Sequence, residues 1–345
     1  MKKFSKVICL MLAFIMIIAV LGGCKSEPVI QEETATTEEE VQQDEEVATT
    51  EEDMELTIGY IMGGPDLWNQ SQSDAIKYTC DKLGWSLITL NSEYNSEKEL
   101  SNAEDILSRD VDAVIMFTVN ASTGQKVALL CNEAGVPLFL LDGDVGEGPG
   151  EAVTVSGYDF YECGKIVGEY LNENRPDSNL AVITGLPGAG IIEAYQDGLE
   201  SILSDSIKMV DVQPGDWDRA KAMSAMENML TSKKDIDIVY VHNEEMAMGA
   251  VKALKNAGKL GEIEVVSANG SPDGITMLEN GEMLMTVTES PSYEGVAAVK
   301  AISDYFNGID VPKRILVPLE AITIDNIEDI LTWDVSDALL DLVGI

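Results

Sequence analysis

The sequence contains little that could support catalysis or metal binding. It has one histidine, His242, and five cysteines among 345 residues. A Ser-His or Cys-His catalytic pair would have to use that imidazole, and we expect it beside the binding residues or at the surface. No Cys and His spacing matches a zinc site, and no D-x-D-x-D-G stretch provides a calcium loop. We therefore expect neither an enzyme nor a metalloprotein, and no cofactor.

Basic residues are also scarce. The chain has 22 Lys and Arg against 61 Asp and Glu, a formal net charge of -39. Beyond residue 55 it keeps 18 basic and 48 acidic side chains, so the charge there is still near -30. Such a surface repels polyanions. This excess argues against nucleic acid and against anionic ligands.

The cysteines beyond residue 55 do not suggest a disulfide. They are three in number, which is odd, and each falls in a helical pattern: Cys80, Cys131 and Cys163. We expect them to be small buried apolar side chains.

The first residues resemble an export signal. Lys2, Lys3 and Lys6 precede an apolar run from 7 to 21 that is short for a membrane span, which predicts a signal peptide over residues 1–23. The run ends in Leu21-Gly22-Gly23-Cys24, which resembles the lipobox of bacterial lipoproteins. The resemblance implies that the Cys24 thiol carries a diacylglyceryl group, and that acyl chains anchor the protein on the outer face of the cell membrane.

Residues 24–55 form the next segment. They have almost no large apolar side chains and are rich in Glu, Thr and Gln. Such a segment cannot bury enough surface to offset its chain entropy. We expect an acidic disordered tether between the lipidated cysteine and the folded part.

About 290 residues remain, more than one core usually fills, so two lobes are expected. Apolar β-branched runs alternate with amphipathic stretches in two series, which predicts an α/β fold of two doubly wound parallel-sheet lobes. Strands are expected to begin near 56, 86, 113 and 137 in the first series, and near 180, 207, 236, 263 and 284 in the second. Helices are expected near 71–83, 96–109, 122–134, 190–203, 217–231 and 244–257.

Two helix starts carry the spacing of a capping box. Ser96 is followed by Glu99, and Ser122 by Gln125. In a capping box the hydroxyl and the carboxylate or amide satisfy each other's free backbone N–H groups. We expect both serines to be N-caps.

Polar and aromatic residues stand directly after the expected strands. In parallel sheets, ligands bind beyond the carboxyl ends of the strands. Carboxylates and amides hydrogen-bond paired hydroxyl groups, while an indole covers the C–H face of a sugar ring. The candidate ligand-binding residues at these ends are Asp66, Trp68, Asp142, Asp159, Asn243, Asn269 and Glu289.

The folded part resembles the ribose-binding, type I periplasmic sugar-binding proteins. The resemblance is carried by DKLG at 81–84, YNSEKELSNAEDIL at 94–107, QPGDWDRAKA at 213–222, HNEEMAMGAVKAL at 242–254 and NGSPDG at 269–274. It implies two lobes joined by a three-segment hinge that close around a ligand, and a membrane permease of an ABC importer as partner. On this basis the N-terminal lobe is 56–157 plus 290–318, and the C-terminal lobe is 158–289 plus 319–345.

The resemblance also implies roles for single residues. Trp68 and Trp217 fall on stacking aromatic positions, and Asp142 falls on the aspartate that closes the fourth strand. Asn243 matches a pocket asparagine. Asn269 stands where an aspartate is common in the family, and Glu289 where an amide is common.

The sequence departs from the family at two charged donors. Gly143 stands where an arginine usually follows the fourth-strand aspartate, and Glu193 and Tyr195 stand in the helix that usually supplies a second arginine. Several carboxylates would then share a cleft without counter-charge, which is costly unless the ligand, a cation or raised pKa values compensate. This motivates the hypothesis of a cationic ligand such as an amino sugar, beside the expectation of a neutral sugar.

The resemblance leaves two functions open. The first is capture of a small polar molecule, a sugar, for an ABC importer. The second is a sensory receptor for a sugar-like signal molecule, because both need closure stabilised by ligand. We expect a monomer, and we expect the tail from 325 to 345 to form a helix packed on a lobe.

Overall fold

Short apolar strands alternate with amphipathic helices along the chain, as the periodicity predicts. The computed structural model describes residues 54–186, 191–232, 235–328 and 330–345. The predicted signal peptide, Cys24 and nearly all of the tether lie outside these residues. The described residues belong to one compact unit, and two separate parallel sheets lie within it.

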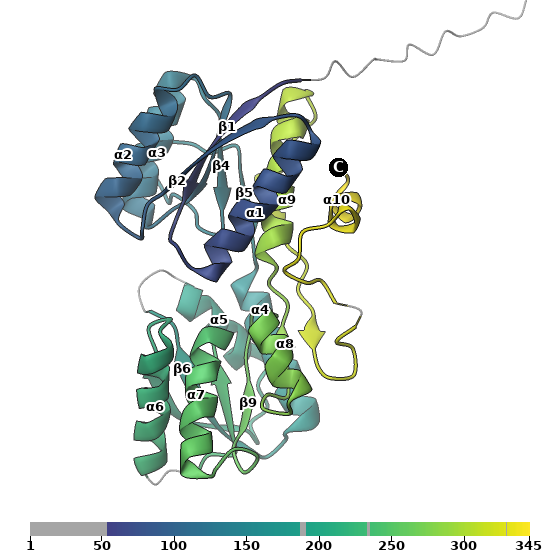
Figure 1. Ribbon diagram of the computed structural model, residues 1–345. Coiled ribbons are helices and arrows are strands. Elements are labelled where there is room, and N and C mark those ends of the chain that lie inside the picture. The colour runs from purple at the N-terminus through teal and green to yellow at the C-terminus, as the bar shows by residue number, and fades with distance from the viewer. Residues whose placement is uncertain (1–53, 187–190, 233–234, 329) are drawn as a thin grey trace, which may run out of the picture. The chain divides into compact units, whose positions relative to one another are not determined.

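The first sheet has six strands in the order β11-β5-β4-β3-β1-β2, all paired in parallel. Its strands are β1 (Thr57–Met62), β2 (Ser86–Asn91), β3 (Ala113–Phe117), β4 (Leu138–Leu141), β5 (Thr154–Gly157) and β11 (Arg314–Leu316). Its helices are α1 (Leu67–Lys82), α2 (Ser96–Leu107), α3 (Ala121–Ala134) and α9 (Pro291–Phe306). Figure 1 shows α2 and α3 on one face of this sheet and α1 and α9 on the other.

The second sheet has four parallel strands in the order β7-β6-β8-β9. Its strands are β6 (Asn179–Thr184), β7 (Lys208–Pro214), β8 (Ile238–Val241) and β9 (Glu264–Val266), and β10 (Thr286–Val287) pairs antiparallel with β12 (Ala321–Ile322) beside them. Its helices are α4 (Phe160–Asn174), α5 (Ile191–Ile202), α6 (Arg219–Thr231), α7 (Glu244–Ala257) and α8 (Pro272–Glu279). The last helix, α10 (Asp337–Val343), follows a long segment after β12.

Each sheet is buried on both faces, which explains its near-continuous apolar strands. One core of the first sheet contains Ile76, Cys80 and Ile302 and the other contains Ile106 and Cys131. The second sheet likewise has one core with α4 and α5 and another with α6 and α7. The predicted pair of doubly wound parallel sheets is confirmed.

The three cysteines are free and buried, as predicted. Burial raises the pKa of the Cys80 and Cys131 thiols to about 12, so these thiols are not nucleophiles at neutral pH.

The predicted capping boxes are wrong. The N-caps of α2 and α3 are Asn95 and Asn120, whose side chains accept hydrogen bonds from the backbone N–H groups of Lys98 and Thr123. An asparagine one or two residues earlier meets the same need for an acceptor. Glu99 is buried and instead accepts a hydrogen bond from the backbone N–H of Val119 at 2.5 Å.

The chain passes from one sheet to the other after β5, before α9 and after β11. No described helix is long and apolar enough to span a bilayer.

Candidate binding site

Three of the predicted ligand residues cap helices directly after strands. Asp66, Asp159 and Asn243 are the N-caps of α1, α4 and α7. Each side chain accepts a hydrogen bond from the backbone N–H three residues later, at 3.1, 3.1 and 2.9 Å. One side-chain oxygen is therefore committed to the helix, which fixes the position of the side chain at the carboxyl end of its sheet.

Trp68 and Asp142 are in direct contact. Trp68 lies in the first turn of α1, and Asp142 follows β4 with a left-handed backbone, φ 56°. The indole Nε1 donates a hydrogen bond to Asp142 Oδ2 at 3.1 Å, although 74 residues separate the two. The structure thus brings together an aromatic ring and a carboxylate that the sequence analysis placed after two different strands.

A buried glutamate lies behind this pair. Glu294, in the first turn of α9, accepts hydrogen bonds from the backbone N–H of Asp142 at 2.6 Å and from Gln72 Nε2 at 2.6 Å. Burial raises the pKa of both the Asp142 and the Glu294 carboxyl groups, and the charge of Asp142 raises that of Glu294 further. Two adjacent buried carboxyl groups favour sharing one proton.

Sequence reasoning missed Glu294. Its signal is a single acid three residues after Pro291 and directly before the apolar stretch GVAAV, at the start of a helix that was not predicted. An acid on the buried face of a helix needs partners, and Gln72 and the Asp142 backbone provide them.

A second group forms at the ends of the strands of the second sheet. Tyr195 Oη donates to Glu289 Oε1 at 2.6 Å, and Asn269 Nδ2 donates to Glu289 Oε2 at 2.6 Å. Glu289 is 1% exposed, and burial raises its pKa to about 7. The structure therefore joins three of the predicted residues through one carboxyl group.

Trp217 follows β7 with a left-handed backbone, φ 59°, and its ring covers Gly185. A Cβ at Gly185 would lie 2.0 Å from Trp217 Cζ2, so the indole needs glycine there. The His242 ring lies 6.5 Å from the Trp217 ring and 4.9 Å from the Tyr195 ring, between centroids.

His242 is fully buried beside Tyr195 and Trp217, so of the two expected positions the one at the surface is wrong and the one beside the predicted binding residues agrees with the structure. Burial lowers its pKa to about 3, and its two ring nitrogens have no hydrogen-bond partner among the described residues. It packs as a neutral aromatic ring, and no geometry here supports general-base catalysis.

Five of the predicted residues lie outside the two hydrogen-bonded groups, and two of these five, Glu193 and Asp159, have exposed side chains. The surface hollows of about 440 and 730 Å³ lie beside α6 and near the start of β4, and neither is lined by a predicted ligand residue. Within the described ranges, no group of three or more His, Cys, Asp or Glu is placed to hold a metal ion.

A row of rings links the two groups. Tyr158 lies 5.6 Å from Trp68, Phe160 lies 6.1 Å from Tyr158, and Tyr195 lies 5.2 Å from Phe160, between ring centroids. Trp333 from the C-terminal segment also touches both groups: its ring lies 5.3 Å from Trp68, and its Nε1 donates to the Asn269 carbonyl oxygen at 3.0 Å. No pattern in the sequence predicts this role for Trp333.

Known proteins share this sequence pattern and fold. A family model described as a periplasmic binding protein domain matches residues 58–310. The ribose import binding protein of Escherichia coli (strain K12) is 28% identical over 254 residues, which cover 73% of this chain and 85% of that protein.

Solved structures of binding proteins share the fold of this chain. An ABC transporter solute binding protein from Bacillus halodurans C-125 with bound myo-inositol has a TM-score of 0.72 and 26% identity, covering 81% of this chain and 98% of that one. The binding protein of the arabinose ABC transporter from Shewanella sp. ANA-3, bound to L-arabinofuranose, has a TM-score of 0.73 and 27% identity over 79% of this chain and 93% of that one. The chain belongs to the periplasmic binding protein domain family, with the parallel α/β fold of its type I members.

Proposed function

We propose that this protein captures a small polar molecule, a sugar, outside the cytoplasmic membrane and delivers it to the permease of an ABC importer. The observation that carries the proposal is the contact between Trp68 and Asp142. An indole face and a carboxylate acceptor in one place suit a ring with apolar C–H faces and hydroxyl edges. The similar proteins are named for binding ribose, myo-inositol and arabinofuranose, which are all neutral polyhydroxylated rings, and they are binding proteins rather than enzymes.

The ligand-binding residues in this proposal are the ten of the sequence analysis. Five of them lie in the two hydrogen-bonded groups: Trp68 and Asp142 in one, and Tyr195, Asn269 and Glu289 in the other. Asp66, Asp159 and Asn243 stand at helix starts, where backbone N–H groups add to the polar lining. Glu193 and Trp217 complete the proposed set.

Binding would be coupled to movement of the two lobes. The chain crosses between the sheets at few points, so a rotation there changes few φ and ψ angles. A ligand that contacts both groups stabilises the closed arrangement by its differential affinity for it. The lobe boundaries given above belong to this proposal except at α10, which packs against α1 and α9 of the N-terminal lobe and not on the C-terminal lobe. A monomeric state belongs to the proposal as well. The relatives favour import over the sensory alternative.

A cationic ligand such as an amino sugar is the second candidate, because Glu289 and Glu294 are buried, Asp142 is partly buried, and Gly143 replaces an arginine. Calorimetric titration with a panel of neutral pentoses, hexoses and inositols and a matched panel of amino sugars separates the two. We expect a neutral sugar to bind at one equivalent. Tight binding of amines alone would favour the second candidate, and binding of neither panel would contradict sugar capture.

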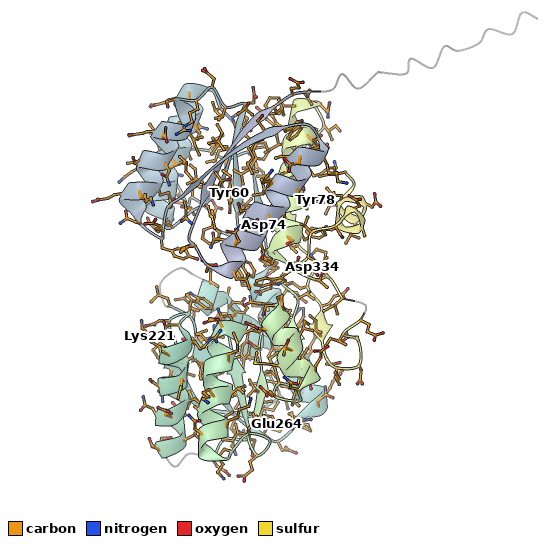
Figure 2. All side chains as sticks on the ribbon, in the orientation of Figure 1. Tyr60, Asp74, Tyr78, Lys221, Glu264 and Asp334 are labelled. Carbon is orange, nitrogen blue, oxygen red and sulfur yellow. The ribbon has the colours of Figure 1, made fainter. Side chains whose placement is uncertain are left out.

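Two variants locate the binding site. Asp142→Asn removes the carboxylate charge and is expected to weaken binding about tenfold or more, since a charged hydrogen bond contributes about 1.5–3 kcal/mol. Asp74→Asn is the matched control, because Asp74 is exposed on α1 (Figure 2). Equal affinity of both variants would place the ligand elsewhere.

We further propose that Cys24 is the lipidated N-terminal residue of the mature protein and that residues 25–55 tether the lobes to the membrane. The basic start, the apolar run and the Leu21-Gly22-Gly23-Cys24 sequence support this. Cys24→Ser is expected to lose incorporation of labelled palmitate, while Cys9→Ser keeps it. Equal labelling of the two variants would contradict the proposal.

A further inference from the structure

The C-terminal segment from Thr323 to Ile345 follows β12 and lies beyond residue 310, where the match to the family model ends. Its first part packs on the second sheet. Ile327 and Ile330 lie against the apolar core formed there by α6 and α7. The Asn326 side chain also donates to the Ala321 carbonyl oxygen at 2.9 Å.

The end of the segment packs on the first sheet's helices. Leu339 and Leu340 of α10 are buried against Ala75 of α1 and Val296 of α9, and Figure 1 shows α10 beside these helices. The segment is therefore held by apolar contacts at both ends, one on the elements of each sheet.

Polar contacts contribute less than these apolar contacts to holding α10 in place. Asp337 pairs with Lys82 Nζ at 2.6 Å and accepts from Tyr78 Oη at 2.8 Å, but the Lys82 and Asp337 side chains are 47% and 71% exposed. Tyr78 is labelled on α1 in Figure 2. Exposed ion pairs contribute little, so the buried leucines hold α10 in place.

Trp333 lies between these two attachments. Its indole is edge-on to Trp68, with an interplanar angle of 86°, and its N–H donates to the Asn269 carbonyl oxygen. Its own carbonyl oxygen accepts from Ser292 Oγ, and the Thr332 carbonyl oxygen accepts from Ser290 Oγ at 2.8 Å. These serines begin α9, where the chain crosses between the sheets. One side chain thus contacts a proposed ligand residue on each side of the crossing.

We propose that Trp333 is a positioning residue for ligand binding and that the segment 323–345 is a fourth connection between the lobes. Its edge contact orients the Trp68 indole, and its hydrogen bond ties that indole to the strand end that carries Asn269. Rotation of one lobe against the other must change the Trp68–Trp333 or the Trp333–Asn269 distance. The segment therefore limits how far the lobes separate without ligand. The affinity part of this inference rests on the proposed sugar-binding function, and the lobe-separation part does not.

The test uses the chain from residue 54 onward with spin labels at Glu104→Cys and Lys252→Cys, which are exposed positions on α2 and α7. Pulsed electron paramagnetic resonance then measures the distance between the labels without ligand. We expect Trp333→Ala to broaden and lengthen the distance distribution. Trp333→Phe, which keeps a ring edge but loses the N–H donor, is expected to fall between Trp333→Ala and the parent. Asp334→Ala, at the exposed neighbour labelled in Figure 2, is the control and should match the parent.

Calorimetry with the sugar that binds the parent gives the second readout. We expect Trp333→Ala to weaken binding about tenfold or more, because it loses an aromatic pair and a hydrogen bond. Identical distance distributions for Trp333→Ala, Trp333→Phe and the parent would overturn the fourth connection, and unchanged affinity in Trp333→Ala would overturn the positioning role. If the parent binds no sugar, the proposed function fails while the distance measurement still decides on the connection. If Trp333→Ala does not fold, Trp333→Phe carries both readouts.

Discussion

At the scale of single residues, several side chains have a structural partner as well as a proposed ligand. Asn243 caps α7, and Glu289 accepts hydrogen bonds from two neighbours. Loss of ligand binding in a variant therefore has two possible causes, loss of a ligand contact or loss of the local structure. Paired substitutions separate the two.

Asn243 allows such a separation. We expect Asn243→Ala to lower the free energy of unfolding by about 1 kcal/mol, because the Met246 N–H loses its acceptor. Asn243→Asp keeps that acceptor and is expected to keep stability, yet it loses the amide donor and should bind ligand more weakly. Urea denaturation and calorimetry measure the two effects.

Asp218 provides the control, because it caps α6 and is not among the proposed ligand residues. Asp218→Ala should lose similar stability and keep its affinity. If Asn243→Asp bound ligand as tightly as the parent, Asn243 would be a cap alone.

At the scale of elements, the site depends on how closely α4 and α5 approach. A Cβ on Gly198 would lie 1.9 Å from the Tyr161 carbonyl oxygen, and a Cβ on Gly164 would lie 2.1 Å from the Tyr195 carbonyl oxygen. The two helices are thus in backbone contact, which only glycine permits. This contact sets the position of Tyr195 relative to Glu289.

We expect Gly198→Ala to lower the free energy of unfolding by about 1–3 kcal/mol, because the methyl group forces the helices apart. Ligand affinity should fall as well, since Tyr195 moves with α5. Denaturation and calorimetry on Gly198→Ala are compared with Glu200→Ala, on the exposed side of α5. Unchanged stability of Gly198→Ala would show that the helices adjust without cost.

Helices and strands were predictable from the sequence where burial imposes a regular spacing of apolar residues. The apolar runs of β1, β4, β6 and β8 are buried on both faces and were identified. Helix α9 was missed, although Ser290 and Pro291 mark its start, because its residues are small and apolar nearly all round. Helix α1 begins at Leu67, four residues before the predicted start, because the Asp66 side chain caps it.

The contacts of the site were less predictable than its residue types. The predicted strand ends identified Asp142 and Glu289 as candidate site residues. The spacing of apolar residues along the chain contains no information about distant partners such as Glu294 or Trp333. Those partners lie 152 and 265 positions along the chain from Asp142 and Trp68, and only the packing of α9 and the C-terminal segment brings them close.

At the scale of the whole molecule, the buried carboxyl groups make stability depend on pH. The pKa of Glu289 is raised to about 7, so the folded protein holds a proton that the unfolded chain releases above about 4.5. Stability is then greatest at low pH and falls as pH rises through this window, by up to about 3 kcal/mol for Glu289. The raised pKa values of Asp142 and Glu294 act in the same direction.

Burial of His242 has the opposite effect on how stability depends on pH. Its pKa is lowered to about 3, so the unfolded chain binds the extra proton between about 3 and 6.5, and stability rises with pH there. The carboxyl groups outnumber this one imidazole. We therefore expect urea denaturation to show lower stability at pH 8 than at pH 5.5. Glu289→Gln, which keeps an acceptor for Tyr195, should reduce that difference, and a parent protein that gains stability up to pH 8 would contradict the assignment.

The measurement that tests sugar capture most directly is mass spectrometry of the small molecule released when the purified chain from residue 54 onward is denatured. Cells grown on a mixture of sugars supply the protein, and Asp74→Asn and Asp142→Asn variants are prepared alongside. The account predicts one neutral polyhydroxylated compound near one equivalent in the parent and in Asp74→Asn, and much less in Asp142→Asn. A retained compound that is not a sugar, or the same amount of sugar in all three proteins, would contradict it.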